Sequence, residues 1–241
     1  EDLRKRKNTD SLSLIGKNTT ERQKPRIYFF PGLYSRWNSM RGLFEVVASD
    51  KEVDCFVVPI PYYFKNGLGV CSPAQWDFSL YEKELGQNNP FLLDFRSLNL
   101  KEASPDIIFI NEPSDEYNLN FMSDPVFFSK NLKQFTKNLI YIPWFLTSEI
   151  DIEDEEDGKA IINAENYVIM PALVHCDYAV LQSDAIEKLY RRLLEREGGA
   201  EYANYWKEKL LPWGSPLFDK ISGKELHSSP EIWRKLKDIL T

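Results

Sequence analysis

The chain has 241 residues with a formal net charge of −7, 43% hydrophobic and 14% aromatic residues, which is enough apolar material for one large domain or two small ones. The acidic balance argues against a general nucleic-acid-binding protein, because such proteins are usually basic. The two histidines and three cysteines lack metal-like spacing, so we expect no metal site, no cofactor and no disulfide framework.

Residues 1–24 are mostly charged and polar, and we expect a tail or the end of a helix. No apolar run approaches the ~20 residues that cross a bilayer, and the N-terminal residues lack the pattern of a signal peptide. With so few cysteines, the chain is typical of a reducing, cytoplasmic environment.

The first predicted unit is a strand, a helix and a second strand. Residues 26–30 form an apolar run that Pro31 and Gly32 interrupt. Apolar residues at helical spacing then predict a helix over 37–47, and residues 53–60 form the second strand.

Residues 62–64 are aromatic and are expected in a loop, and residues 65–90 show no clear period. A segment of that length without regular structure is often functional or mobile, so we expect a lid beside a cleft. Residues 91–95 are compatible with a further strand.

The run Ile107 to Ile110 is β-branched and aromatic throughout, which predicts a strand covered on both faces. It ends abruptly, and a dense polar run occupies residues 111–118. Because ligands of open α/β sheets bind outside the carboxyl ends of the strands, this run is the first candidate site. The alternative is an ordinary turn in which Asp115 caps a helix.

The second half continues the alternation of helices and strands. We predict helices over 127–135, 160–174, 184–197, 201–209 and 231–240, and strands over 139–145 and 178–181. Ser183 and Asp184 open one helix, with Glu187 completing a capping box. The acidic run 151–157 is expected to be a solvated loop.

This alternation predicts an α/β fold with a doubly wound parallel sheet over residues 25–221. Residues 222–241 are expected to form a linker and a terminal helix that lead toward a second domain. The sequence contains no phosphate-cradling P-loop, dinucleotide glycine fingerprint or nucleophile elbow. His175 is interpreted as a structural histidine.

Polar, aromatic and glycine residues at the strand ends should gather on one edge of the sheet. Carboxylates there can bind hydroxyls or accept a proton, and aromatic rings can stack on a sugar or a base. We predict Glu112 and Asp115 as catalytic residues. The predicted substrate-binding residues are Gly32, Asn38, Tyr62, Asn111, Tyr117, Trp144, Ser183, Gly214 and Ser215.

Several short motifs occur in the order found in one enzyme family. They are Trp37 to Met40, Val58 to Tyr63, Asn111 to Asn118, Phe128 to Leu132, Tyr141 to Phe145, Val180 to Ser183 and Gly214 to Lys220. Over residues 26–221 the chain resembles the N-terminal half of bacterial CDP-glycerol glycerophosphotransferase-like proteins. It departs from that pattern at Asn111 and Glu112, where the family has a histidine followed by Asn-Pro, and at Asn38, where it has an aspartate.

The resemblance implies a Rossmann-like N-terminal domain of a GT-B-type protein that faces the acceptor during teichoic acid-type polymer synthesis. Its implied partners are CDP-glycerol and a polyol-phosphate or glycan acceptor, and the protein could contact the inner face of the cell membrane. We expect no turnover by this chain alone, because the chain resembles only the acceptor-facing half of these proteins and not the donor-binding half. The alternatives are a non-catalytic sugar- or nucleotide-binding module and half of a nucleotide-sugar epimerase-like enzyme.

Overall fold

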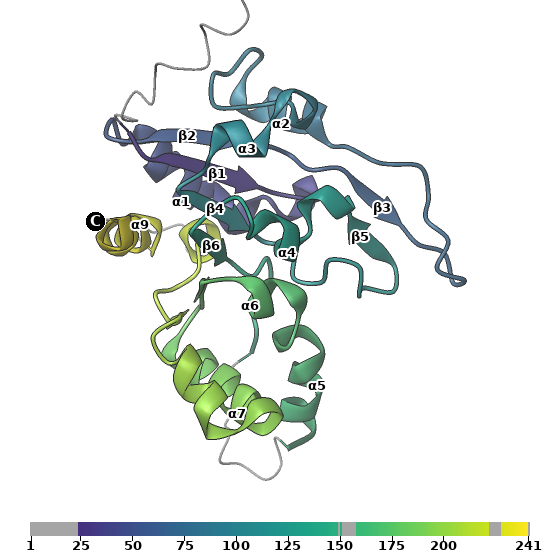
Figure 1. Ribbon diagram of the computed structural model, residues 1–241, viewed down its shortest axis with the longest axis vertical. Helices are drawn as coiled ribbons and strands as arrows, with labels where there is room; N and C mark the ends of the chain where they lie inside the picture. Colours follow the sequence, from purple (N-terminus) through teal and green to yellow (C-terminus); the bar gives the residue numbers. More distant parts are fainter. Residues whose placement is uncertain (1–23, 149, 151–157, 222–227, 241) are drawn as a thin grey trace, which may run out of the picture.

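The computed structural model describes residues 24–148, 150, 158–221 and 228–240. Its main sheet has six parallel strands in the order β2–β1–β4–β6–β7–β8 (Figure 1). These strands are β1 (Arg26–Phe30), β2 (Asp54–Val57), β4 (Ile107–Ile110), β6 (Asn138–Tyr141), β7 (Tyr178–Val180) and β8 (Leu210–Leu211). Helices lie on both faces, which confirms the predicted α/β class with a doubly wound, Rossmann-like sheet.

The central strand β4 is buried at all four of its residues and pairs with β1 and β6. Phe109 lies opposite Phe29 of β1, and their rings stack with centroids 4.5 Å apart. A strand covered on both faces has no position for a polar side chain, which explains the unbroken apolar run.

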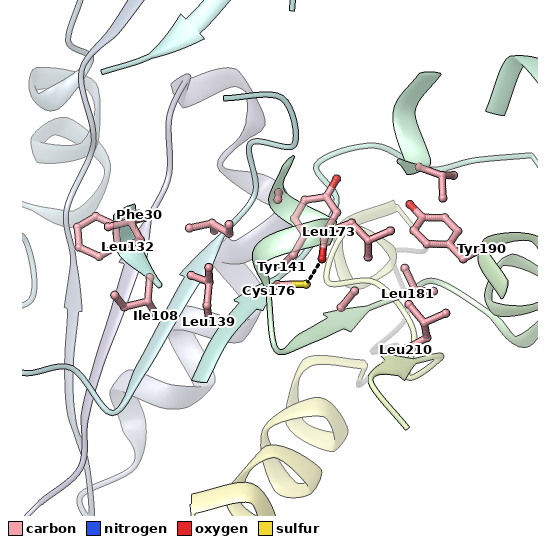
Figure 2. Close-up of a cluster of buried hydrophobic side chains, with 14 of the residues drawn as sticks. Phe30, Ile108, Leu132, Leu139, Tyr141, Leu173, Cys176, Leu181, Tyr190 and Leu210 are labelled. Atoms are coloured by element: carbon pink, nitrogen blue, oxygen red, sulfur yellow. Dashed lines mark hydrogen bonds between the residues drawn. The ribbon is translucent and has the colours of Figure 1, made fainter. Parts of the chain in front are cut away.

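Two apolar layers hold the helices to the sheet. One face carries α1 (Asn38–Ser49) and α9 (Ser228–Leu240). The other carries α3 (Leu100–Ala103), α4 (Ser129–Leu132), α5 (Gly158–Val168), α6 (Pro171–His175) and α7 (Asp184–Trp206). Figure 2 shows this second layer, where Leu132, Leu173 and Tyr190 pack with side chains of the strands.

The terminal helix α9 is confirmed and packs against α1. It buries Ile232, Trp233 and Leu236, and the Trp233 Nε1–H donates to Asp50 at 2.9 Å. Asp219 of α8 (Phe218–Ile221) accepts from the backbone N–H groups of Ser228 and Ser229 at the start of α9. These contacts hold α9 against the main sheet.

A second, two-stranded antiparallel sheet pairs β3 (Tyr62–Phe64) with β5 (Phe121–Ser123) and extends away from the main sheet in Figure 1. The prediction of an irregular segment over 62–90 was therefore wrong. The segment also contains α2 (Phe78–Leu85), whose Tyr81 is fully buried. The pairing partner lies about sixty residues away in the sequence, so no local pattern indicates β3.

Other boundaries differ from the prediction because tertiary contacts set them. Residues 91–95 form no strand: only Leu92 bridges to Val57, and the 3-10 helix η2 (Phe95–Ser97) follows. In place of one helix over 127–135, η3 (Pro125–Phe127) precedes the single turn of α4. Ser183 alone caps α7 by accepting from the Ile186 N–H, so Asp184 lies inside the helix and the predicted capping box is wrong.

Gly199 has a φ of 75° inside α7, which divides that helix where two helices were predicted. The predictions for 1–23, the acidic run 151–157 and most of the linker, 222–227, concern residues outside the described part of the chain.

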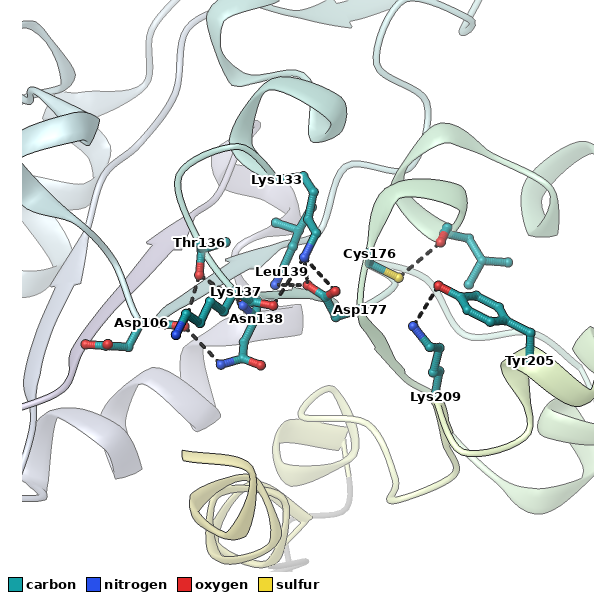
Figure 3. Close-up of polar contacts among 11 residues, drawn as sticks. Asp106, Lys133, Thr136, Lys137, Asn138, Leu139, Cys176, Asp177, Tyr205 and Lys209 are labelled. Carbon is teal, nitrogen blue, oxygen red and sulfur yellow. Dashed lines mark hydrogen bonds and ion pairs between the residues drawn. The ribbon is translucent and has the colours of Figure 1, made fainter. Parts of the chain in front are cut away.

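Charged groups at the amino ends of the strands serve the architecture (Figure 3). Lys133 pairs with Asp177 at 2.6 Å, and Asp177 also accepts from the backbone N–H of Leu139 at 2.8 Å. The carboxylate thereby ties β7 to the start of β6.

Candidate functional site

The chain reverses its direction of sheet building between β1 and β4. From β1 it adds β2 on one side, and it then crosses to add β4, β6, β7 and β8 on the other. The carboxyl ends of β1 and β4 therefore flank a topological switch point, which is where open α/β sheets bind ligands. Gly32 follows β1 there, and Asn111 and Glu112 follow β4.

Arg36 occupies this switch point. It belongs to the 3-10 helix η1 (Tyr34–Arg36), which joins β1 to α1. Its guanidinium lies 4.1 Å from the ring centroid of Trp144 and 4.9 Å from that of Phe121. Cation–π contacts of this kind hold the guanidinium in place. The side chain keeps 15% of its surface exposed, so part of it remains accessible from solvent.

Glu112 is the counter-ion of Arg36. The guanidinium Nη1 pairs with Glu112 Oε2, and the hydroxyl of Ser114 donates to Oε1 at 2.9 Å. The Glu112 side chain is only 6% exposed. Burial raises the pKa of Glu112 above its usual value, and the nearby Arg36 offsets that rise only in part.

Asn111 holds the Arg36 turn against the strand. Its side-chain amide donates to the Arg36 carbonyl at 3.3 Å and to the hydroxyl of Ser39 at 3.1 Å. Among the described residues, neither the Asn111 Oδ1 nor the hydroxyl of buried Tyr141 has a hydrogen-bond partner. The Nε1–H of Trp144 has no partner there either. Buried polar groups usually find partners, so these atoms are unusual for a purely structural cluster.

Asp115 has a different environment from Glu112. It is 3% exposed, and its carboxylate accepts from the backbone N–H of Ser129 at 3.0 Å and from its hydroxyl at 2.7 Å. Ser129 begins α4, and its Oγ lies 2.8 Å from Nδ1 of His175. Burial raises the pKa of Asp115 despite these hydrogen bonds. The geometry favours the alternative in which Asp115 caps a helix, and it gives His175 a structural partner.

Glu112 and Asp115 are predicted from the sequence as catalytic residues, but the structure buries both side chains. The reason is tertiary: Arg36 and Ser129 provide partners from other segments of the chain, which compensates their burial. Their catalytic assignment remains a prediction.

Asn111 and Trp144 contact Arg36, and the other predicted binding residues have different surroundings. Gly32 faces Phe121, because a Cβ built on it would lie 4.0 Å from that ring. Tyr62 is 5% exposed and donates to Asp77 at 3.0 Å; burial and Asp77 raise the pKa of Tyr62 to about 12. Its buried ring offers little stacking surface. Asn38 and Tyr117 are exposed.

Ser183, Gly214 and Ser215 lie at the ends of β7 and β8, further along the same edge. Ser183 caps α7, and Gly214 has a φ of 100°, a conformation that favours glycine. The Gly214 N–H donates to the Leu181 carbonyl at 3.1 Å, and Ser215 is 6% exposed. Ser183 and Gly214 therefore have structural roles, and the binding roles of all three residues remain predictions.

Arg36 and Phe121 were not among the site residues predicted from the sequence. Arg36 lies four residues after Gly32 in the turn that follows the first strand, so its position at the switch point was recognisable. Phe121 was not, because its approach to Arg36 depends on the β3–β5 pairing. Within the described residues, no group of three His, Cys, Asp or Glu side chains could hold a metal ion, and no helix could cross a membrane.

Comparison with known proteins gives two similar solved structures. The S. aureus MnaA–UDP co-structure has a TM-score of 0.39 at 12% identity, with 80% of this chain and 44% of that chain covered. A crystal structure of UDP-N-acetylglucosamine 2-epimerase has a TM-score of 0.36 at 11% identity, with coverage of 74% and 47%. The chain thus spans less than half the length of either. No family model and no curated protein sequence matches it.

Proposed function

We propose that the switch-point edge binds the phosphate of a phosphorylated polyol or sugar, as the acceptor-side domain of a CDP-glycerol glycerophosphotransferase-like enzyme. The observation that carries this proposal is the guanidinium of Arg36 at the switch point, which contacts the rings of Trp144 and Phe121. Arginine donates through a planar fork that matches phosphate oxygens. A positioned, partly exposed arginine at this place is suited to an anionic group.

The surroundings of Arg36 support a ligand that also carries hydroxyl groups. Asn111 Oδ1 can accept a hydrogen bond, and the Nε1–H of Trp144 can donate one. Both atoms lack partners among the described residues and are themselves buried, so a ligand hydroxyl has to displace neighbouring side chains to reach them. The sequence motifs at Asn111 to Asn118 and Tyr141 to Phe145, which carry the family resemblance, supply these same groups.

The test is calorimetric titration of the chain with glycerol 3-phosphate, CDP-glycerol and UDP-N-acetylglucosamine. Arg36→Gln should weaken binding of glycerol 3-phosphate about ten- to a hundred-fold, because a hydrogen bond to a charged group contributes about 1.5–3 kcal/mol. The matched control is Arg192→Gln on α7, where the arginine side chain is 65% exposed; its affinity should not change.

Three results would count against the proposal in different ways. Absence of binding would overturn it. Equal affinities in the wild type and Arg36→Gln would place the phosphate elsewhere. Binding of UDP-N-acetylglucosamine without binding of glycerol 3-phosphate would favour the alternative, half of a nucleotide-sugar epimerase-like enzyme.

A further inference from the structure

The ion pair between Arg36 and Glu112 has a consequence for any anion that binds at Arg36. Glu112 is buried, and Arg36 is the only cationic side chain that pairs with it among the described residues. Trp144 and Phe121 lie against the guanidinium. An anion that binds the N–H groups of this guanidinium therefore comes close to the Glu112 carboxylate.

We propose that binding of an anionic group at Arg36 is coupled to uptake of one proton by Glu112, so that the bound ligand faces a neutral carboxyl group instead of a carboxylate. This inference rests on the proposed function, because it concerns the same arginine. It adds a property of the site, namely that binding of the anionic ligand converts Glu112 from a carboxylate into a neutral carboxylic acid.

The coupling follows from charge and burial. A second anion close to a buried carboxylate disfavours its ionised form, whether the anion displaces Glu112 from Arg36 or shares the guanidinium with it. The starting position already favours proton uptake, since burial raises the pKa of Glu112 and the nearby Asp115 carboxylate acts in the same direction. The proton comes from solvent, and it makes the net charge of Arg36, Glu112 and the ligand together less negative by one unit.

The other ionisable groups around Glu112 do not remove this effect. Asp115 lies in the same loop, and its carboxylate is engaged by Ser129. Tyr141 of β6 stays neutral, because burial raises its pKa well above the usual value. Arg36 of η1 supplies the positive charge that the ligand would share. A protonated Glu112 gains an O–H donor, which can hydrogen-bond a ligand oxygen.

The test uses glycerophosphoglycerol, whose phosphodiester keeps one negative charge near neutral pH. Binding heats are compared in two buffers of different ionisation enthalpy at about pH 7.5, where an ordinary carboxyl group is ionised. The wild type should take up as much as one proton per ligand bound. Glu112→Gln should bind with equal or higher affinity and take up almost none.

Two control variants identify the group that takes up the proton. Glu231→Gln on α9 changes a carboxylate that is 45% exposed and should retain the wild-type uptake. Asp115→Asn removes the neighbouring charge that helps to raise the pKa of Glu112, so its uptake should fall in part without being lost. As a second readout that needs no variant, affinity of the wild type should rise by up to about tenfold per unit fall in pH while uptake is complete.

The outcomes separate the two proposals. Binding without proton uptake, or unchanged uptake in Glu112→Gln, would overturn the coupling and leave the anion site intact. Loss of uptake in Asp115→Asn alone would also overturn it, because the proton would then belong to Asp115. If glycerophosphoglycerol, glycerol 3-phosphate and CDP-glycerol all fail to bind, the proposed function fails and the coupling fails with it.

Discussion

Glu112 should give the protein a characteristic pH dependence even without a ligand. Its pKa in the folded protein is raised by burial, so the neutral form is the better tolerated one. Its stabilising contribution is therefore present at low pH and is lost as pH rises through the folded-state pKa. Relative to Glu112→Gln, the wild type should lose free energy of unfolding as pH rises above about 4.5, the ordinary pKa of a glutamate.

Urea unfolding of both proteins across this pH range measures the difference. Glu231→Gln is the control: hydrogen bonds from Arg234 lower the pKa of Glu231 to about 2, so it stays ionised and should add no slope over this range. A flat difference between the wild type and Glu112→Gln would mean that Arg36 fully compensates the burial of the carboxylate.

Asp115 is predicted to contribute to stability through Ser129. Asp115→Ala leaves the N–H and hydroxyl of Ser129 without their acceptor and places alanine at a φ of 44°. We expect a loss of about 2–3 kcal/mol in the free energy of unfolding. Asp115→Asn keeps an acceptor and a side chain that tolerates this φ, so it should lose about 1 kcal/mol.

Chemical denaturation of the two variants, together with titration of glycerol 3-phosphate, checks this prediction. If Asp115→Asn instead keeps full stability and loses affinity, Asp115 acts on the ligand, as the sequence first suggested.

At the scale of elements, the packing of α1 against α9 depends on a glycine. A Cβ added to Gly42 would lie 2.8 Å from the Ser229 hydroxyl oxygen and 3.1 Å from an Asp219 oxygen. Those two side chains hydrogen-bond each other at the start of α9. Gly42→Ala should therefore displace α9 and cost about 1 kcal/mol or more, although alanine favours the helix itself.

The matched control is Gly158→Ala, because a Cβ on Gly158, the first residue of α5, meets nothing within 4 Å. Its melting temperature should stay the same or rise slightly. The expected displacement in Gly42→Ala should also change the fluorescence of Trp233, whose indole donates to Asp50. Equal melting temperatures for both variants would show that α9 is not held through this contact.

At the scale of the whole molecule, the two sheets should differ in local stability. The central strands β1, β4 and β6 are almost entirely buried, whereas the β3–β5 pair is short and carries exposed apolar residues near it, Phe64, Leu68, Val70 and Leu119. Local opening depends on buried contacts. Hydrogen exchange should be slowest in β1, β4 and β6 and faster over 62–72 and 118–123. Equal protection would mean that both sheets unfold as one unit.

Segment 65–90 should not exchange uniformly. We predict slow exchange in α2, because Tyr81 is fully buried and the Trp76 indole donates to the Pro59 carbonyl at 2.9 Å. The turn at Asn66 to Val70, where Leu68 is 90% exposed, should exchange fast. Fast exchange in α2 would instead support the mobile lid that was predicted from the sequence.

The sequence by itself determined the class of fold and the edge on which to look for a site. Strands such as Ile107 to Ile110 are apolar throughout because both faces of a parallel sheet are covered, and helices such as α1 and α9 show one apolar face. These are local patterns. The polar run after β4 likewise follows from where the apolar run stops, so Asn111 and Glu112 could be placed at the carboxyl edge.

Only the tertiary structure decided which polar residues act together. Arg36 meets Glu112 across 76 positions, and Asp115 meets Ser129 across 14. These partners turn two similar carboxylates into a counter-ion and a helix cap. The contacts of Trp144 and Phe121 with Arg36 depend on the pairing of β6 with β4 and of β5 with β3. Such contacts depend on chain topology and side-chain burial, which leave no period in the sequence.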